Sequence, residues 1–303
     1  MAIESMKIIL DRAHSSGYAV CYCEAWNMES LQAVVEAAEE VQSPVITGFN
    51  GGFLMHPIHA RPANLAYYAG MALAISKTKV PTAFLLNETD SLSQIEEAIS
   101  LGFNGVMVEN GHLSLEEYRR LVKKVIGMGR HLNVSVEAQI GRLPDGSGHM
   151  AAELTDPAKA RSFVEETGVD ALGVAVGNVH ILTTGKSSID FETLERIHDA
   201  VQIPLVLHGG TGIPLDLAQG CIRRGVAKVN YGTMLKQAYL EAARVKLAQY
   251  HAPMNPHLFL GMGGKEDILV AGINAVKLKV RELLVAFGSA GQANGTQARG
   301  GSS

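Results

Sequence analysis

Eight short apolar segments recur along the chain, and longer amphipathic segments separate them. The apolar segments cover residues 18–23, 44–49, 81–86, 105–110, 134–139, 171–176, 204–209 and 227–232. They hardly alternate between polar and apolar residues, which is typical of parallel strands buried on both faces. The segments between them, such as 30–41, 91–102 and 114–129, repeat their apolar residues with the period of a helix. Eight strand–helix units predict a (β/α)8 barrel, the TIM barrel.

An open, doubly wound sheet is the alternative fold, because it has the same alternation of strands and helices. No GxGxxG sequence follows the first strand, which argues against the dinucleotide-binding form of that fold. We expect extra helices before the first strand and over 265–287, and a capping box of Ser114 and Glu117 at a helix start. The predicted single domain spans residues 1–292, and the Gly-, Ser- and Gln-rich segment 293–303 is predicted to be a disordered tail.

The composition of the chain excludes several classes of binding partner. Its formal net charge is −4 without any run of Lys and Arg, which argues against binding to nucleic acid or an anionic membrane. The start of the chain lacks the features of a signal peptide, and the apolar runs are too short to span a bilayer. Cys21, Cys23 and Cys221 are too few for a disulfide framework. Cys21 and Cys23 lie two apart on a predicted strand, where we expect packing residues, with a metal or redox role as the alternative. We therefore expect a cytoplasmic protein that binds a small molecule.

Polar residues follow nearly every predicted strand, and the carboxyl ends of the strands are where such barrels have their active sites. A single polar residue there is as readily explained as a helix cap or a loop residue. The whole set is harder to explain by structure alone, and it indicates a functional site. It comprises Glu24, Asn50, Asn87, Glu88, Glu109, Asn110, Glu137, His180, His208 and Asn230.

Two of these residues are histidines on neighbouring strands. His180 follows the sixth predicted strand and His208 ends the seventh, so their imidazoles can converge at the mouth of the barrel. A carboxylate from the third or fifth strand, Glu88 or Glu137, would complete a His/His/carboxylate site for a divalent metal ion. Taken alone, each histidine is more simply explained as a loop or core residue than as a metal ligand.

Two turns are suited to bind an anion. Gly209, Gly210 and Thr211 follow the seventh strand, and Asn230, Gly232 and Thr233 follow the eighth at a helix start. Such turns present backbone N–H groups to a phosphate. The loops after strands seven and eight are the usual phosphate site of these barrels, so the sequence predicts phosphate binding there.

Several longer segments share their pattern with one enzyme family. They are 27–46, 95–117, 134–141, 154–180, 203–214, 225–233 and 286–293. Through them the chain resembles the class II, metal-dependent ketose-bisphosphate aldolases over about residues 5–292. The resemblance implies a (β/α)8 barrel, a dimer or tetramer, and reversible cleavage of a phosphorylated ketose into dihydroxyacetone phosphate and an aldehyde. It also implies a zinc ion that stabilises the enediolate left when the C–C bond breaks.

Roles can be carried over where the residues match. His180 and His208 match two zinc ligands, and Glu137 matches a carboxylate associated with the metal. The phosphate cradle is matched by Gly209, Thr211 and Thr233. We place four further residues with the substrate-binding residues: Asn50, Gly177, Gly210 and Gly232. Asn230 matches the residue that contacts the dihydroxyacetone part of the substrate.

The sequence departs from the family after the third strand. The family has Asp-His there, an acid that moves protons and a third imidazole ligand, whereas this chain has Asn87-Glu88. Asn87 can orient a hydroxyl but cannot act as a base. Glu88 can replace the imidazole as a ligand, which would shift the metal preference from zinc toward Mn²⁺ or Mg²⁺.

Other departures from the family pattern lie at the same mouth of the predicted barrel. Glu24 replaces an Asn, Asn50 replaces a Ser, and Glu109-Asn110 replaces Asp-Gly. Thr184 stands where a Lys is usual after the sixth strand, with Lys186 nearby. The loop 142–153 differs from the family loop that carries an acid; its candidates for proton transfer are Asp145, His149 and Glu153.

The leading hypothesis is a divergent metal-dependent aldolase, or a related lyase, for a phosphorylated ketose or sugar acid. Glu88 would be a metal ligand or the replacement base, and Asn87, Glu137 and Glu24 are further catalytic candidates. Glu24, Glu109 and the loop 142–153 are the further candidates for proton transfer. The alternatives are an isomerase, epimerase or decarboxylase that uses the same enediolate, and a non-catalytic sugar-phosphate-binding homologue. The substrate itself does not follow from the sequence, because specificity in these barrels lies in the loops.

Overall fold

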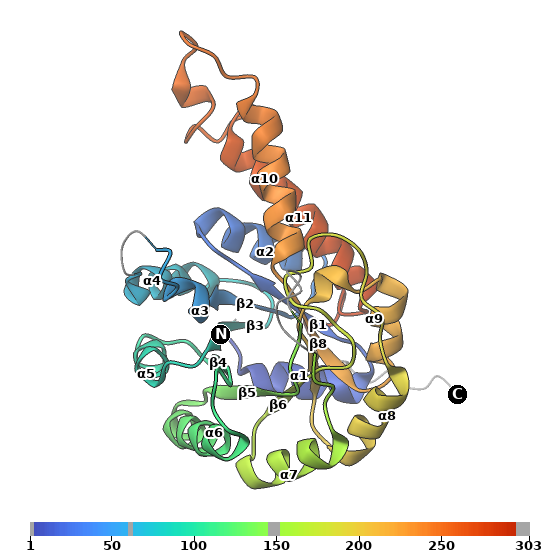
Figure 1. The fold of residues 1–303 in the computed structure, drawn as a ribbon. Coiled ribbons are helices and arrows are strands. Elements are labelled where there is room, and N and C mark those ends of the chain that lie inside the picture. The colour runs from blue at the N-terminus through green and yellow to red at the C-terminus, as the bar shows by residue number, and fades with distance from the viewer. Residues whose placement is uncertain (1–2, 60–62, 145–151, 295–303) are drawn as a thin grey trace, which may run out of the picture.

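Eight parallel strands form a closed barrel in the computed structural model, which describes residues 3–59, 63–144 and 152–294 (Figure 1). Each strand pairs with its neighbours in sequence, and β1 pairs with β8. The predicted (β/α)8 barrel is therefore confirmed, and the open doubly wound sheet is excluded. The strands are β1 Val20–Glu24, β2 Val45–Asn50, β3 Thr82–Thr89, β4 Gly105–Val108, β5 Ser135–Ile140, β6 Ala171–Val174, β7 Leu205–Leu207 and β8 Val226–Tyr231.

Helices surround the barrel and follow the strands in turn (Figure 1). Their bounds are α1 Met6–Ser16, α2 Met28–Glu40, α3 Gly51–Leu54, α4 Leu65–Ile75, α5 Leu92–Ser100, α6 Leu115–Gly129, α7 Pro157–Thr167, α8 Phe191–Ala200, α9 Leu215–Ile222, α10 Thr233–Leu247 and α11 Ile268–Ala286. The extra helices α1 and α11 are both as predicted. The capping box of α6 is confirmed, because the Ser114 and Glu117 side chains each accept from the other residue's backbone N–H. Three short 3-10 turns complete the described structure: η1 Arg130–Leu132, η2 Gly210–Gly212 and η3 Pro256–Leu258.

The apolar side chains form two buried layers. The larger one lies between the strands and the outer helices and includes Val34, Phe84 and Leu194. The smaller one combines Met6 and Leu10 of α1 with side chains that point into the barrel, such as Ile46, Leu85 and Val206. Helix α1 thus closes the amino end of the barrel with apolar side chains, and the polar residues are left at the carboxyl end of the strands.

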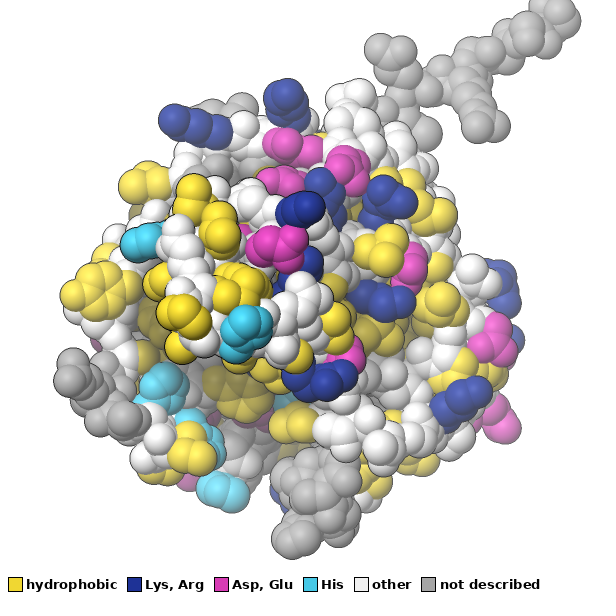
Figure 2. Space-filling model, turned by 90° about the horizontal axis from the view of Figure 1, so that it is seen from above, with side chains coloured by type: hydrophobic (Ala, Val, Ile, Leu, Met, Phe, Trp, Pro, Cys, Tyr) yellow, Lys and Arg dark blue, Asp and Glu magenta, His cyan; other side chains and the backbone are white. Residues whose placement is uncertain are grey.

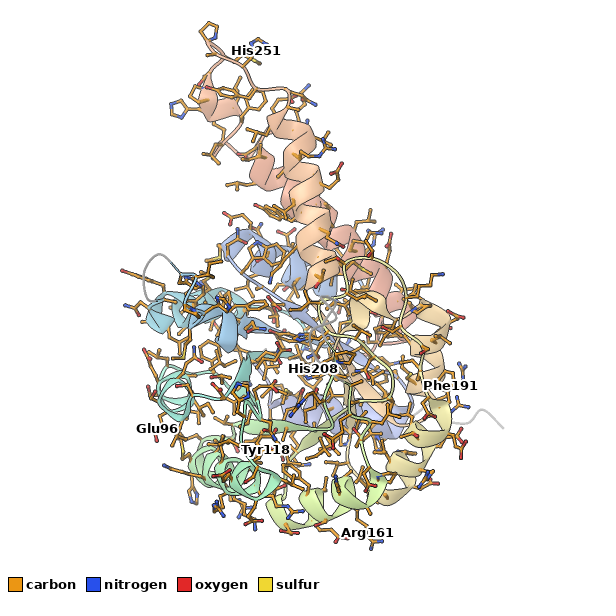
Figure 3. All side chains as sticks on the ribbon, in the orientation of Figure 1. Glu96, Tyr118, Arg161, Phe191, His208 and His251 are labelled. Atoms are coloured by element: carbon orange, nitrogen blue, oxygen red, sulfur yellow. The ribbon has the colours of Figure 1, made fainter. Side chains whose placement is uncertain are left out.

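Helices α10 and α11 pack against each other and extend beyond the barrel as an arm, with His251 near its tip (Figures 1 and 3). Helix α11 was expected from the sequence, but this arm was not. Exposed apolar side chains on it include Leu240, Leu260 and Met262, and Figure 2, which looks onto the molecule from the side of the arm, shows such side chains interspersed with charged ones. Among the described helices, none combines the length and apolarity that crossing a membrane would need.

Asp267 fixes the turn between the two arm helices. Its carboxylate accepts hydrogen bonds from the backbone N–H groups of Gly261, Gly263 and Leu269, and its side chain is buried at the start of α11. Burial alone would raise the pKa of Asp267, but these backbone donors hold the pKa below its usual value.

Replacing Asp267 with alanine is expected to lower the free energy of unfolding by about 1–2 kcal/mol at pH 7, because the helix loses its N-cap. The lowered pKa means that the stabilisation is complete above the unfolded-state pKa of about 4 and is lost as the pH falls through the folded-state value. Urea denaturation of the wild type and of Asp267→Ala, at pH 7 and in mild acid, measures the difference in their free energies of unfolding. A difference between the two proteins that grows toward acid pH would contradict the prediction.

Candidate active site

Glu88 has an unusual backbone conformation at the end of β3. Its φ is 55°, in the left-handed region that non-glycine residues rarely adopt. The pairing of β3 with β4 shifts register between Leu86 and Thr89, which is a β-bulge around Asn87 and Glu88. A regular strand would point two successive side chains to opposite faces. Here both Asn87 and Glu88 line the same cavity at the mouth of the barrel. A strained conformation of this kind is typical of functional sites.

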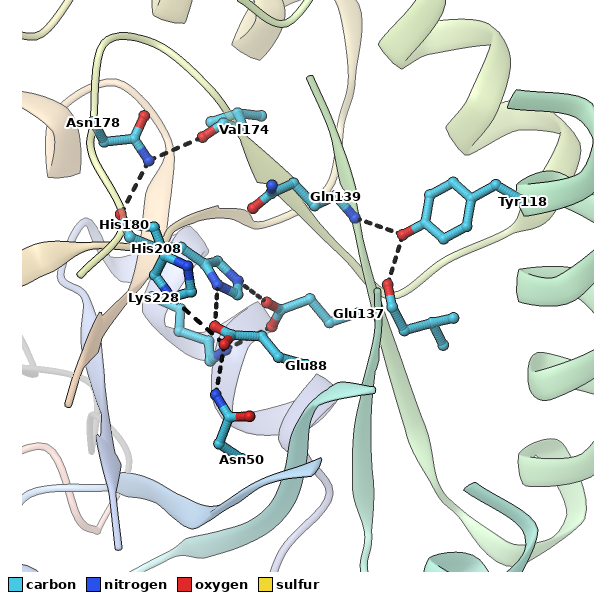
Figure 4. Close-up of polar contacts among 11 residues, drawn as sticks. Asn50, Glu88, Tyr118, Glu137, Gln139, Val174, Asn178, His180, His208 and Lys228 are labelled. Carbon is cyan, nitrogen blue, oxygen red and sulfur yellow. Dashed lines mark hydrogen bonds and ion pairs between the residues drawn. The ribbon is translucent and has the colours of Figure 1, made fainter. Parts of the chain in front are cut away.

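Three polar side chains hold the Glu88 carboxylate (Figure 4). His208 Nδ1 lies 2.9 Å from Oε1, and Asn50 donates from Nδ2 to Oε2 at 2.6 Å. His180 Nε2 lies 3.5 Å from Oε2. The two histidines from neighbouring strands therefore converge on Glu88, as the sequence analysis expected, and Asn50 of β2 joins them.

His208 is also held from its other side (Figure 4). Its Nε2 lies 2.8 Å from Oε1 of Glu137, and Lys228 Nζ donates to Oε2 of Glu137 at 2.7 Å. Glu137 and Lys228 are completely buried. With both ring nitrogens protonated, His208 donates from Nε2–H to Glu137 and from Nδ1–H to Glu88. The backbone of His208 is fixed as well, because Asn178 donates to its carbonyl oxygen at 3.0 Å.

Burial and pairing compete in setting the charges of this cluster. Burial alone would raise the pKa of Glu88, but His180 and His208 hold it well below its usual range. Burial would lower the pKa of His208, yet its hydrogen bonds to Glu137 and Glu88 raise it to about 9. Glu137 has a lowered pKa despite its burial, because Lys228 and His208 favour its charged form. In the absence of a metal, the stable state of the cluster therefore has ionised Glu88 and Glu137 on either side of a protonated His208.

Two cavities meet at Glu88 and His180, which line both. The wide cavity, of about 570 Å³, is lined by residues at the ends of β2, β4 and β5 among others, including Asn50, Glu109 and Gln139. The narrow cavity, of about 250 Å³, is lined by Glu24, Asn87, Gly209, Thr211, Asn230, Gly232, Thr233 and Lys236, among others. The narrow cavity therefore contains the predicted phosphate turns, and Glu88 separates it from the wide cavity.

Buried polar atoms without partners line the narrow cavity. Within the described residues, Asn87 Oδ1, Tyr22 Oη and both amide atoms of Asn230 have no hydrogen-bond partner. The three side chains are at most 7% exposed. A buried polar atom without a partner costs about 1–3 kcal/mol, so these groups on β1, β3 and β8 are arranged for a polar ligand rather than for stability alone.

The structure separates some predicted residues from the cavities. A Cβ on Gly177 would lie 2.3 Å from the backbone oxygen of Ser188, and one on Gly210 would meet the Asn230 oxygen at 2.8 Å. Close packing of the backbone explains these two glycines, which do not line either cavity. Thr211 does line the narrow cavity, and its hydroxyl accepts from Met234 N at the start of α10. Glu137 is enclosed by His208 and Lys228 and lines neither cavity.

Two candidates of the loop 142–153, Asp145 and His149, lie outside the described residues, as does the predicted tail from residue 295 on. Glu153 is described and exposed, 3.7 Å from Lys159, and it lines the wide cavity.

Sequence reasoning missed three residues of this site: Asn178, Lys228 and Lys236. Lys228 carried a usable signal, because a charged residue in the middle of a buried apolar strand requires a partner. Lys236 lies one helical turn after Thr233 and therefore faces the same cavity. Asn178 gave no signal, since its role depends on the spacing between β6 and β7.

The donor atoms of this cluster suit a divalent cation, because two imidazoles and a carboxylate approach one another at the mouth. Glu88 contacts both histidines directly in the described conformation. Accordingly, the described residues contain no three His, Cys, Asp or Glu side chains already placed around a common metal position. The donor set fits a metal in its chemistry, provided that the Glu88 contacts to the imidazoles are exchanged for the ion.

A closed eight-stranded barrel with polar groups at the carboxyl ends of its strands has the architecture of a TIM-barrel enzyme. Comparison with known families makes this specific: residues 4–292 match the class-II fructose-bisphosphate aldolases. The chain belongs to this family, as its resemblance in sequence predicted. The family consists of aldolases that are generally dependent on a divalent metal.

Solved structures agree with this assignment. The chain is similar to the YdjI aldolase from Escherichia coli K12, at 30% identity and a TM-score of 0.79, over 96% of this chain and 99% of that one. It also has the fold of a fructose-bisphosphate aldolase from Campylobacter jejuni, at 21% identity and a TM-score of 0.75, over 95% and 96% of the two chains. The second similarity supports the fold alone.

Proposed function

We propose that this protein is a metal-dependent aldolase that cleaves or forms a C–C bond in a phosphorylated ketose or sugar acid. The observation that carries the proposal is the position of Glu88, which contacts His180 and His208 at the junction of the two cavities. A substrate that spans this junction has its phosphate in the narrow cavity and its aldehyde part in the wide one. The bond to be broken then lies beside the His/His/Glu cluster.

Glu88, His180 and His208 would hold the metal. A divalent cation in this position would polarise the substrate carbonyl and stabilise the enediolate that remains after C–C cleavage. Without a metal, His180 and His208 outweigh the effect of burial and hold the pKa of Glu88 well below its usual range, so this carboxylate is ionised and available to a cation. One carboxylate in place of an imidazole favours Mn²⁺ or Mg²⁺ over zinc relative to a three-histidine site. Glu137 orients His208 as an outer partner instead of binding the metal.

Glu109 is our candidate for proton transfer. It lines the wide cavity, on the side of Glu88 where the aldehyde part would lie. Burial, followed by the charge of Glu88, raises the pKa of Glu109, so it can hold a proton closer to neutral pH than an ordinary carboxyl. Asn87 is not an acid–base group. We assign its unpartnered amide oxygen, together with the unpartnered amide of Asn230, to holding substrate hydroxyl groups.

The metal and the reaction can be tested together. We expect the purified protein to contain a divalent metal, and EDTA to remove both the metal and the activity, with Mn²⁺ restoring at least as much activity as Zn²⁺. Incubation with dihydroxyacetone phosphate in D₂O is expected to exchange the α-proton, which NMR detects. Exchange without any aldol product would favour an isomerase or epimerase that uses the same enediolate. Tight phosphate binding without exchange or turnover would indicate a non-catalytic homologue and would refute the proposal.

A further inference from the structure

Glu24 places a carboxylate at the start of α10, in the cradle where a phosphate is expected. A Cβ added to Gly232 would lie 2.6 Å from Glu24 Oε2, so the carboxylate rests directly against this turn. Helix α10 has 15 residues, no side-chain N-cap and no acidic residue in its first turn. Its positive end therefore receives its negative charge from Glu24 of β1.

Lys236 completes this arrangement. Its ammonium group hydrogen-bonds to Glu24 Oε1, and it lies 4.6 Å from the centre of the Phe53 ring and 5.9 Å from that of Trp26. Among the described residues that line the narrow cavity, Lys236 is the only Lys or Arg. Its side chain is 32% exposed, whereas that of Glu24 is 10% exposed. The cation thus lies between two aromatic faces and can be reached from the cavity.

The surroundings point to a ligand rather than to a permanent ion pair. Asn230, which is 7% exposed, lines the same cavity with both amide atoms unpartnered. Lys186, in the segment after β6, is exposed and does not line the narrow cavity. A dianion in this cavity would therefore have Lys236 as its lysine partner, and it could not share the turn with an ionised Glu24.

We propose that the Glu24 carboxylate is an internal substitute for the substrate phosphate. A phosphomonoester that enters the narrow cavity displaces Glu24 from Lys236 and from the start of α10, and it pairs with Lys236 in its place. Lys236 is then the residue that recognises phosphate, and Glu24 competes with the ligand for it. This inference rests on the proposed function only in its choice of substrate.

Titration of the metal-loaded protein with inorganic phosphate tests the exchange. Lys236→Met is expected to weaken phosphate binding at least about tenfold, because it removes a charged hydrogen-bond donor. Lys236→Arg should retain binding to within about threefold, since it keeps the positive charge. Glu24→Gln is expected to tighten binding about tenfold, because the competing anion is gone. Glu241→Gln and Lys246→Met, which alter ion pairs elsewhere on α10, are matched controls that should leave binding unchanged.

Unchanged or weaker phosphate binding by folded Glu24→Gln would overturn the competition, and unchanged binding by Lys236→Met would overturn the assignment of Lys236. Kinetics provide a second readout. With a phosphorylated substrate, Lys236→Met should raise KM far more than it lowers kcat. If the protein binds phosphate with this pattern but cleaves no ketose phosphate, the proposed function fails and the exchange stands. Cleavage with no change of phosphate affinity in the variants refutes the exchange alone.

Discussion

Replacement of Glu88 by glutamine is expected to lower kcat at least about a hundredfold and to weaken metal binding by a similar factor. Loss of an outer partner of a metal ligand alone typically costs 10–100-fold in affinity or activity, and Glu88 is proposed to contact the metal directly. The variant keeps the size of the side chain and can still accept from Asn50. Metal content after dialysis, together with steady-state kinetics at saturating metal, gives both effects.

Glu109→Gln is the matched control for this prediction. It removes a carboxylate from the wide cavity without touching the histidines, so it should retain the metal and lose about a hundredfold in kcat. Equal metal content in wild type and Glu88→Gln would contradict the ligand role of Glu88. Full activity of Glu109→Gln would exclude Glu109 as the group that transfers the proton.

Lys228→Met is expected to cause the largest loss of stability, about 3–5 kcal/mol in the free energy of unfolding. Lys228 and Glu137 are both completely buried and pair at 2.7 Å, so the substitution leaves a buried carboxylate with only His208 as a partner. Chemical denaturation followed by circular dichroism measures the loss.

The double variant Lys228→Met, Glu137→Gln should recover a large part of that stability, because neither side chain then carries a charge. Lys277→Met removes two ion pairs near the surface, with Glu40 at 2.6 Å and Glu36 at 3.1 Å, and should cost about 1 kcal/mol or less. A similar small loss for Lys228→Met would mean that Glu137 takes up a proton or finds another partner inside the barrel.

The fold was predictable because the strands carry their own signal. Runs such as 105–110 and 171–176 are apolar on both faces, and only a covered parallel sheet accommodates eight of them. The strand-end position of His180, His208 and Glu88 followed from the same reasoning, since barrel strands bring their carboxyl ends to one mouth. The arm was not predictable, because α10 and α11 pack on each other as well as on the barrel, and no pattern in the sequence indicates that they extend beyond it.

The partners within the site depended on three-dimensional geometry. Nothing in the sequence indicates that a bulge gives Glu88 a positive φ and turns it, together with Asn87, into one cavity. By resemblance, Glu137 matched a carboxylate associated with the metal. Only the structure reveals that the buried Lys228 pairs with the Glu137 carboxylate and neutralises its charge. Glu24 and Lys236 are 212 residues apart, so their pairing could not be inferred from their spacing.

Release of the aldehyde and dihydroxyacetone phosphate from a panel of ketose 1-phosphates is the most direct measurement of the central claim. We predict that the protein loaded with Mn²⁺ or Zn²⁺ cleaves at least one member of the panel, and that folded Glu88→Gln protein does not cleave it measurably. The absence of cleavage with every ketose phosphate and each metal would contradict the account, as would undiminished cleavage by the Glu88→Gln variant.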